Sequence, residues 1–274
     1  MPKISIVVPI HNMQDYLRES LDSAVSQTLE DIEVICVDDG STDKTAAILR
    51  EYAKRDSRVR VITHKENKSA SQARKDGALA ADGEYLMFLD ADDTLDLDAC
   101  ERLYASVRDT PVDILHFGTL ITNEKKLPQD RMDWLQAFVS PFDGELLGSE
   151  ILEGCFSHEL YNFSLWDKLY SADLCKKAFS RVRDGRFPIG EDKYAYFVLS
   201  YYARTYRGMN DAALYHYCLG RGVTGQDAIS LSQFEEFCSM GLVADAIKGF
   251  LVEEDALQQH EATYLHARKE LLMN

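Results

Sequence analysis

One run of residues decides the fold, an apolar strand that ends in three carboxylates: Tyr85-Leu86-Met87-Phe88-Leu89-Asp90-Ala91-Asp92-Asp93. In a parallel sheet, ligands bind beyond the carboxyl ends of the strands, so acidic residues at that edge are placed to meet a ligand. Carboxylates this close repel one another unless a cation lies among them, and Mg2+ and Mn2+ favour oxygen ligands. The alternative is a solvated acidic turn in which Asp93 or Thr94 caps the next helix.

A second apolar run, residues 32–37, ends in a similar way with Asp38-Asp39-Gly40-Ser41-Thr42-Asp43. The glycine permits a tight turn, and Ser41 or Thr42 would cap a helix that begins near residue 44. A turn and a cap account for the later residues of this run but leave the pair of aspartates unexplained. Two strands of one sheet that end in paired aspartates therefore predict a single acidic cleft.

The order of the segments predicts an α/β fold with a mostly parallel sheet. Strand-like runs alternate with helical patterns; the strands fall near residues 4–8, 32–37, 59–62 and 85–89, and the helices near 17–25, 43–54 and 69–81. Such alternation implies right-handed crossovers, with helices on both faces of the sheet. The first strand is not followed by G-x-G-x-x-G, which disfavours an ordinary dinucleotide fold. A further strand is predicted at 112–120, and a loop at 123–131.

Four segments, taken in order, resemble the signatures of family 2 glycosyltransferases, which have the GT-A (Rossmann-like) fold: residues 5–12, 37–43, 67–77 and 88–93. The resemblance covers roughly residues 3–120 and is thinner beyond them. His11 departs from the pattern, because the family usually has Tyr or another aromatic residue at that place. This departure leaves the stacking contact with the nucleotide base open.

The resemblance implies that residues 1–225 form a GT-A glycosyltransferase domain. Its first half, residues 1–120, would bind the nucleotide sugar, and residues 121–225 would line the acceptor side of the cleft. The last residues, 226–274, carry apolar positions three and four apart and predict a C-terminal helical extension. A helical hairpin that covers the catalytic domain is the main expectation for them, and a homodimer contact or a peripheral membrane surface is the alternative.

The resemblance also implies a donor, a nucleotide diphosphate sugar with uridine as the expected base. Asp39 would accept a hydrogen bond from the uracil N–H, and Asp90 would hold the ribose or the adjacent sugar. Asp92 would bind the Mn2+ or Mg2+ that bridges the two phosphates and neutralises charge on the departing nucleotide. The other expected donor contacts are Pro9, His11, Asn12, Asp38, Asn67, Arg74 and Ala91. Without the resemblance, Arg74 would be interpreted as a solvated ion-pair residue.

The candidate catalyst lies in the segment Gly190-Glu191-Asp192, which matches the family's G-E-D segment and precedes an aromatic helix. An acceptor hydroxyl is a poor nucleophile, so a carboxylate must take its proton. The resemblance assigns this role to Asp192, and Glu191 would raise its pKa by like-charge repulsion. The alternative is that both acids stand there only because a helix N-terminus favours negative charge. One base and one metal imply a single displacement with inversion, whereas a glycosidase needs two carboxylates that flank the bond.

Four further residues are candidates for contact with the acceptor or with phosphate. Trp166 and Lys168 belong to a segment similar to the family's W-x-K-L-Y, in which an aromatic ring beside a cation suits a sugar or a phosphate. Residues 215–217 are expected to form a strand before a flexible loop at 220–224, where His216 or Arg221 would reach the diphosphate. The alternatives are that Trp166 is part of the core and that His216 is structural.

The composition excludes some partners. The chain has 46 acidic and 30 basic residues, and a formal charge of −16 argues against nucleic acid as a partner and against a polybasic membrane anchor. The six cysteines show no C-x-x-C or zinc spacing, which favours reduced thiols in a cytoplasmic protein. We see no signal peptide and no apolar run of the roughly 18 residues that a membrane helix needs.

The predicted function is therefore transfer of a sugar to a hydroxyl of a saccharide or of a lipid-linked or cell-surface glycan. Two other classes stay open. A non-catalytic nucleotide-sugar-binding module would keep Asp39 and Asp92 but would not need Asp192. A phosphoester hydrolase with an aspartate nucleophile would place that residue after the first strand, where this chain has Pro9-Ile10-His11.

Overall fold

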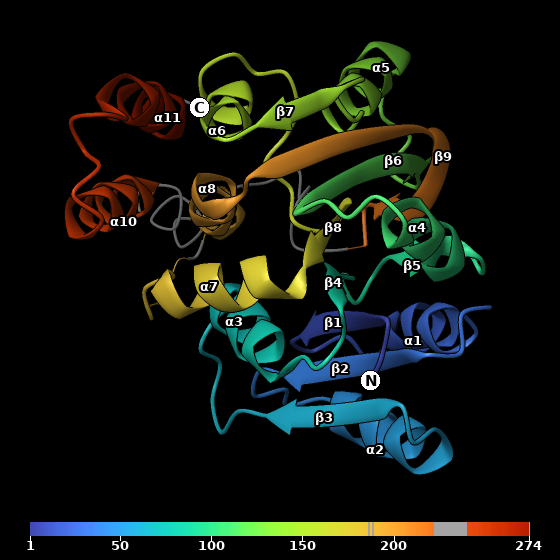
Figure 1. The fold of residues 1–274 in the computed structure, drawn as a ribbon. Helices are drawn as coiled ribbons and strands as arrows, with labels where there is room; N and C mark the ends of the chain where they lie inside the picture. The colour runs from blue at the N-terminus through green and yellow to red at the C-terminus, as the bar shows by residue number, and fades with distance from the viewer. Residues whose placement is uncertain (186, 188, 222–239, 274) are drawn as a thin grey trace.

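The computed structural model describes residues 1–185, 187, 189–221 and 240–273. Nine strands of these residues form one sheet in the order β3-β2-β1-β4-β8-β6-β9-β5, with β7 paired to β9 (Figure 1). The strands are β1 Ile4–Ile10, β2 Ile32–Asp38, β3 Val59–Thr63, β4 Tyr85–Phe88, β5 Thr94–Leu95, β6 Ile114–Asn123, β7 Glu145–Leu147, β8 Lys168–Ser171 and β9 Thr205–Leu219. The helices are α1 Leu17–Val25, α2 Thr45–Arg55, α3 Ala70–Ala80, α4 Ala99–Arg108, α5 Gln129–Phe138, α6 Ser149–Phe156, α7 Ala172–Arg181, α8 Glu191–Tyr202, α10 Met240–Glu253 and α11 Glu261–Met273.

The N-terminal part of the sheet is parallel, as the alternating segments predicted. β1 pairs in parallel with β2 on one side and with β4 on the other, and β3 continues the sheet beyond β2. The strands turn antiparallel at β8, which pairs with β4 and β6. Since the carboxyl ends of β1, β2 and β4 meet at one edge, the loops that follow them lie together there.

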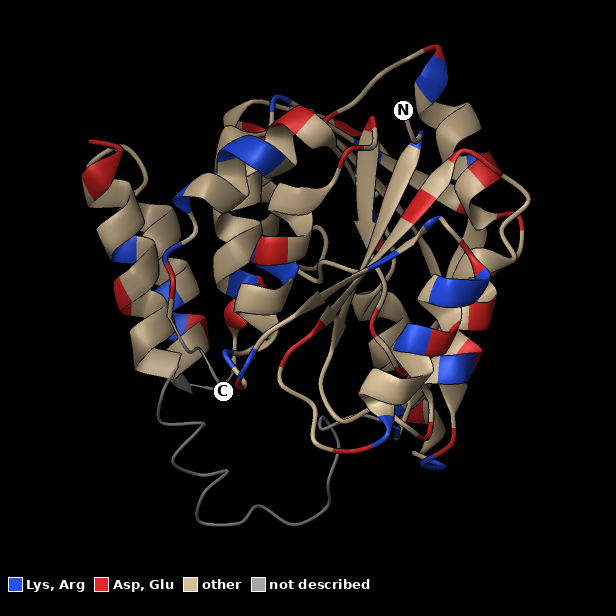
Figure 2. Cartoon of the chain, turned by 90° about the horizontal axis from the view of Figure 1, so that it is seen from below, with Lys and Arg blue, Asp and Glu red and all other residues tan. Residues whose placement is uncertain are grey.

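Both faces of the sheet are buried, which explains why its first strands are almost wholly apolar. Val7 of β1 faces a core shared with α3, α6, α7 and α8. Ile6 and Val8 face the opposite core, which is shared with α1, α2 and α4. Lys and Arg are interspersed with Asp and Glu over the helices on both sides of the sheet (Figure 2). No described helix has the length and apolar character that would let it cross a membrane.

The C-terminal hairpin of α10 and α11 packs beside α8, and its side chains share the first of these cores (Figure 1). Val243, Ile247 and Phe250 of α10 are buried, and the ring of Phe250 meets that of Tyr201 at 5.1 Å. The predicted boundary at 225/226, and the apolar positions predicted between 231 and 237, lie outside the described residues. A homodimer contact or a peripheral membrane surface stays a prediction for this hairpin.

Two local predictions are wrong. Only residues 124–128 of the loop predicted at 123–131 are irregular, because β6 runs through Asn123 and α5 begins at Gln129. Pro128 suggested a loop, but it is the N-cap of α5, a place where the missing N–H of proline costs little. The helix after β2 begins at Thr45 with Lys44 at the N-cap position, so neither Ser41 nor Thr42 caps it; the Thr45 N–H donates to Asp43 Oδ1 at 2.9 Å.

Candidate active site

A cluster of acidic side chains lies at the ends of β2 and β4 and at the first turn of α8, where the sequence predicts an acidic cleft. Asp38 is the last residue of β2, and Asp90 follows β4 by two positions. The acids of α8, Glu191 and Asp192, come to the same edge because α8 packs against α3, whose Arg74 points between them and Asp90. Residues more than a hundred positions apart in the sequence thus meet at one site.

Arg74 is the centre of this site. Its guanidinium donates to Asp192 Oδ1 at 2.7 Å and to Asp90 Oδ1 at 2.9 Å, and Glu191 Oε1 lies 3.3 Å away. The side chain is only 6% exposed, and the buried Nε atom has no protein partner. Arg74 is therefore a buried cation that joins the β4 edge to α8. The alternative interpretation, a solvated ion-pair residue, is wrong.

The site perturbs the protonation of its members. Burial alone would lower the pKa of Arg74, but Asp192, Asp90 and Glu191 together raise it well above its ordinary value. Burial raises the pKa of Asp192 to about 7; Arg74 opposes this rise, and Glu191 and Asp90 add to it. A carboxylate with a pKa near neutrality is suited to accept a proton at physiological pH.

The three acids after β4 have different surroundings. Asp93 is buried, with Oδ2 accepting from the Tyr215 hydroxyl at 2.8 Å and Oδ1 from the Cys218 N–H at 2.7 Å. Burial raises the pKa of Asp93 to about 8, and Asp90 and Asp92 add to the rise. Burial also raises the pKa of Asp92 to about 6, again with a contribution from Asp90. The capping alternative is wrong here, because Asp93 and Thr94 enter the core and β5, and the next helix begins only at Ala99.

The donor set fits a hard divalent cation of the Mg2+ or Mn2+ type. Burial and then the charge of Asp90 raise the pKa of Asp92, and a cation beside it would favour the ionised form that binds a metal. The described carboxylates of the cluster do not converge into a cage of three ligands; the one such group among the described residues joins Glu159, His266 and Glu270 elsewhere. This agrees with an ion that takes one or two carboxylates from the protein and the rest of its ligands from substrate phosphates.

Asp39 lies next to this cluster and accepts several hydrogen bonds. Its Oδ1 lies 2.6 Å from His64 Nδ1 and accepts from the Lys68 N–H at 2.9 Å. Its Oδ2 accepts from the Ser69 N–H at 2.8 Å. The turn after β2 and the loop of residues 64–69 are in close contact, because a Cβ at Gly40 would lie 2.6 Å from the carbonyl carbon of Glu66.

The turn after β1 is tied to the turn after β2 by the polar residues that the sequence singled out. His11 Nδ1 lies 2.8 Å from the Asp39 carbonyl oxygen, and Asn12 Oδ1 accepts from the Thr42 N–H at 2.8 Å. Asp38 is 2% exposed and accepts from the Ser41 N–H at 3.0 Å. The Asp38 carboxylate thus shapes the turn after β2, and its contact with the donor stays a prediction.

The remaining candidates for donor contact lie along the same edge. Pro9 is half-buried near the end of β1, between β2 and β4. Ala91 is buried between the acids of the β4 edge. Asn67 is exposed on the loop that approaches Gly40.

Two of the acceptor-side candidates are structural. Lys168 is fully buried, and its ammonium donates to Asp167 at 2.6 Å, to the Ser164 carbonyl at 2.8 Å and to Asn162 at 3.1 Å. Its predicted contact with sugar or phosphate is wrong, because this network leaves it no access to a ligand. Trp166 is 8% exposed and stacks on Tyr215 at 4.7 Å between ring centroids, which confirms the core alternative.

The other two acceptor-side candidates lie near the surface at the end of β9. His216 Nε2 lies 2.6 Å from Asp96 Oδ1, and the pair is partly exposed. Arg221 is held by Glu19 of α1 and by Glu124, both at 2.6 Å. Of the loop predicted at 220–224, residues 222–224 lie outside the described residues.

Sequence reasoning missed two residues next to Asp39. His64 lies between Asp39 and Asp76, and its Nε2 is 2.8 Å from Asp76 Oδ2. The sequence pattern, a histidine after a strand and an acid twelve residues later in a helix, does not predict this contact. The two residues meet only because α3 packs beside β2.

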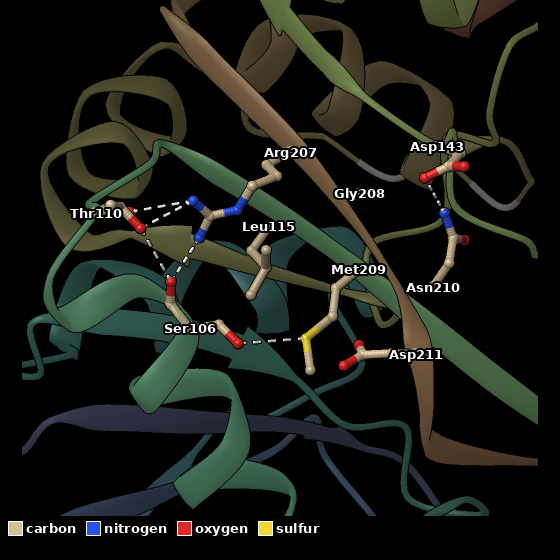
Figure 3. Close-up of a pocket in the computed structure, with 9 residues that line it drawn as sticks. All are labelled: Ser106, Thr110, Leu115, Asp143, Arg207, Gly208, Met209, Asn210 and Asp211. Carbon is tan, nitrogen blue, oxygen red and sulfur yellow. Dashed lines mark hydrogen bonds between the residues drawn. The ribbon is translucent and has the colours of Figure 1, made fainter.

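A separate hollow of about 500 Å³ lies at the opposite edge of the sheet, near the beginnings of β6 and β9 (Figure 3). Leu115, Arg207 and Met209 line it, and Arg207 donates to the Ser106 carbonyl oxygen and to the Thr110 hydroxyl. Because the acidic cluster lies at the carboxyl ends of β2 and β4, this hollow is not part of the site.

Comparison with known proteins agrees with this geometry. The family model described as Glycosyl transferase family 2 matches residues 5–169. Glycosyltransferase GlyA of Streptococcus pneumoniae serotype 4 is 32% identical over 197 residues, which cover 70% of this chain and 27% of that protein. The chain thus spans about a quarter of this relative's length.

Two solved structures share the fold. S. aureus TarS 1–349 in complex with UDP-GlcNAc superposes with a TM-score of 0.70 at 23% identity, covering 98% of this chain and 73% of that one. The mannosyltransferase PcManGT from Pyrobaculum calidifontis, in complex with GDP-Man and Mn2+, gives a TM-score of 0.56 at 15% identity, covering 97% and 86%. With the family model matched over more than half of its length, the chain belongs to glycosyl transferase family 2 and has the GT-A fold.

Proposed function

We propose that the protein is a metal-dependent inverting glycosyltransferase that moves a sugar from a UDP-sugar to a hydroxyl of a saccharide or of a lipid-linked or cell-surface glycan. One observation carries the proposal. Arg74 joins Asp192, a partly buried carboxylate with a pKa near neutrality, to Asp90 at the end of β4. The candidate base and the candidate donor-binding edge are thus joined through one arginine.

Asp192 would act as the general base. Its carboxylate takes the proton of the acceptor hydroxyl as the oxygen forms a bond with the anomeric carbon and the bond from that carbon to the diphosphate breaks. Arg74 keeps the carboxylate in one orientation and favours its ionised form. A single displacement by this route inverts the configuration of the sugar carbon.

The donor side would be held by the ends of β2 and β4. Asp39 would read the base, Asp90 would contact the ribose or the sugar, and Asp92 would hold Mn2+ or Mg2+. When bound, this ion supplies the positive charge that offsets the diphosphate as it leaves. The UDP-GlcNAc bound to TarS and the GDP-Man and Mn2+ bound to PcManGT support these assignments by analogy of fold. The assignment of 1–120 to the donor and of 121–225 to the acceptor is part of the proposal.

The test is the variant Asp192→Asn, assayed with a panel of UDP-sugars and glycan acceptors in the presence of Mn2+. Asn keeps the size of the side chain and can still accept a hydrogen bond from Arg74, so we expect donor affinity to stay within a few-fold. Transfer should fall by about a hundredfold or more, the usual effect of losing a general base. The matched control, Glu191→Gln, changes the neighbouring acid in the same way and should keep most of the transfer.

Transfer by Asp192→Asn at the parent rate would assign the base elsewhere. A nucleotide-sugar-binding module would bind UDP-sugars in the same assay but release no UDP with any acceptor. A phosphoester hydrolase would release phosphate from simple phosphoesters, which a glycosyltransferase leaves intact.

A further inference from the structure

His64 contacts the carboxylate of Asp39, which would accept a hydrogen bond from the nucleotide base. Its ring is 7% exposed and lies between two acids, with Nδ1 at 2.6 Å from Asp39 Oδ1 and Nε2 at 2.8 Å from Asp76 Oδ2. Asp76 belongs to α3 and also accepts from Gln72 Nε2 at 2.9 Å. The imidazole therefore fixes the end of β2 to a helix that is itself packed on the sheet.

Counting donors shows which atom of Asp39 keeps an unused acceptor position. A carboxylate oxygen offers about two acceptor positions, and a carboxylate only accepts, so the contact with Asp39 is a hydrogen bond when His64 Nδ1 carries a hydrogen, and the contact with Asp76 is one when Nε2 does. Oδ1 then receives two donors, His64 and the Lys68 N–H. Oδ2 receives only the Ser69 N–H among the described residues. Asp39 is 2% exposed, and one acceptor position on Oδ2 is unused by the described residues.

We propose that His64 is a positioning residue for base selection, which holds Asp39 so that Oδ2 faces the N3–H of uracil. The inference rests on the proposed function, because it assumes that a uridine nucleotide binds beside Asp39. The close contact between Gly40 and the loop of residues 64–69 leaves the backbone little room to replace the contact from His64. The orientation of the carboxylate therefore depends on the imidazole and on two backbone N–H groups.

This arrangement discriminates between pyrimidines. Uracil presents a hydrogen on N3, which can be donated to a carboxylate oxygen. Cytosine presents a lone pair on N3, which a fixed carboxylate repels. A carboxylate that is free to turn away loses the bond to uracil and avoids the repulsion by cytosine. Loss of the contact from His64 should therefore reduce the preference for UDP over CDP as well as the affinity for UDP.

Two substitutions separate the two hydrogen bonds of the ring. In His64→Asn the amide nitrogen takes the place of Nδ1, so the donor to Asp39 is kept and the link to Asp76 is lost. In His64→Gln the amide nitrogen takes the place of Nε2, so the link to Asp76 is kept and the donor to Asp39 is lost. Both variants remove the aromatic ring, so an effect of packing alone would be similar in the two.

The experiment measures the affinities for UDP and CDP by calorimetry, with Mn2+ present, for the parent and both variants. We expect His64→Asn to bind UDP within about threefold of the parent, and His64→Gln to lose about tenfold for UDP and much less for CDP. Thermal unfolding of each variant reports any general loss of structure. The control is His266→Gln, which removes a histidine from another carboxylate pair, 3.1 Å from Glu159, and should leave UDP binding unchanged.

The outcomes are distinct for the inference and for the proposed function. If the parent shows no binding of UDP, the proposed function fails before His64 is tested. If the parent prefers UDP and His64→Gln keeps that affinity and preference, the inference is overturned. Equal losses in His64→Asn and His64→Gln would also overturn it, because they would assign the effect to packing.

Discussion

Replacing Arg74 by Gln is expected to move the pH dependence of sugar transfer towards alkaline pH. Arg74 favours the ionised form of Asp192, and only the ionised form can accept a proton. Without the guanidinium, the pKa of Asp192 rises above its parent value of about 7. Transfer at neutral pH should therefore fall and should recover as the pH is raised.

The size of this change follows from the geometry. Two unit charges about 4 Å apart interact by about 4 kcal/mol at an effective dielectric constant of 20. The Asp192 side chain is 23% exposed, so we take about half of this value to allow for screening by solvent. At about 1.36 kcal/mol for each pH unit, the midpoint should move by about 1.5 units.

The assay is the pH profile of kcat/KM for release of UDP from the UDP-sugar, with Mn2+ and acceptor present, since this profile reports the free enzyme. Arg74→Lys keeps the charge and should keep the midpoint near that of the parent, although Lys lacks the planar fork that joins several carboxylates. Arg18→Gln removes an exposed arginine paired with Glu51 and should change nothing. A uniform loss of rate in Arg74→Gln with an unmoved midpoint would refute the reasoning.

Two further changes test the metal and the base pocket. Asp92→Ala removes a carboxylate that lies close to other acids, so the fold should be kept. The affinity for UDP, measured by calorimetry, should no longer depend on Mn2+. An unchanged dependence on Mn2+ would contradict the metal assignment. Gly40→Ala should lower the free energy of unfolding by about 1–3 kcal/mol and weaken UDP binding, because φ is +68° and the new Cβ would meet the Glu66 backbone at 2.6 Å. Denaturant unfolding measures the change in stability, and calorimetry measures the affinity for UDP. A variant with the stability and UDP affinity of the parent would mean that the loop of residues 64–69 can move.

The sequence predicted the parallel half of the fold well because apolar strands, turns and helices alternate there in short local patterns. β1, β2 and α3 lie within one or two residues of their predicted places. The helix α5 was missed for a local reason, since none of its residues is fully buried and its first turn follows a proline. Its apolar side chains Met132, Leu135 and Phe138 are only partly buried against the core, so the apolar stripe that marks this helix is short.

The sequence predicted which residues belong to the candidate site, but it did not predict which of them contact one another. Asp90, Asp192 and Arg74 were each singled out, yet the ion pair between Arg74 and Asp192 joins residues 118 positions apart. Lys168 was misassigned because a lysine is rarely fully buried, and the acid that neutralises it, Asp167, is its immediate neighbour. Local sequence patterns do not report which partner a charged side chain finds across the fold.

The excess of acid in the cluster explains why the metal and the nucleotide should bind together. Asp90 and Asp92 follow one strand, and a diphosphate brought to this edge without a cation would add negative charge to theirs. Arg74 offsets only part of that charge, because its guanidinium is shared among Asp90, Glu191 and Asp192. A divalent cation held by Asp92, as proposed, would relieve both repulsions at once. By linkage, Mn2+ should raise the affinity for UDP by the same factor as UDP raises the affinity for Mn2+, and Asp92→Ala should remove both effects equally.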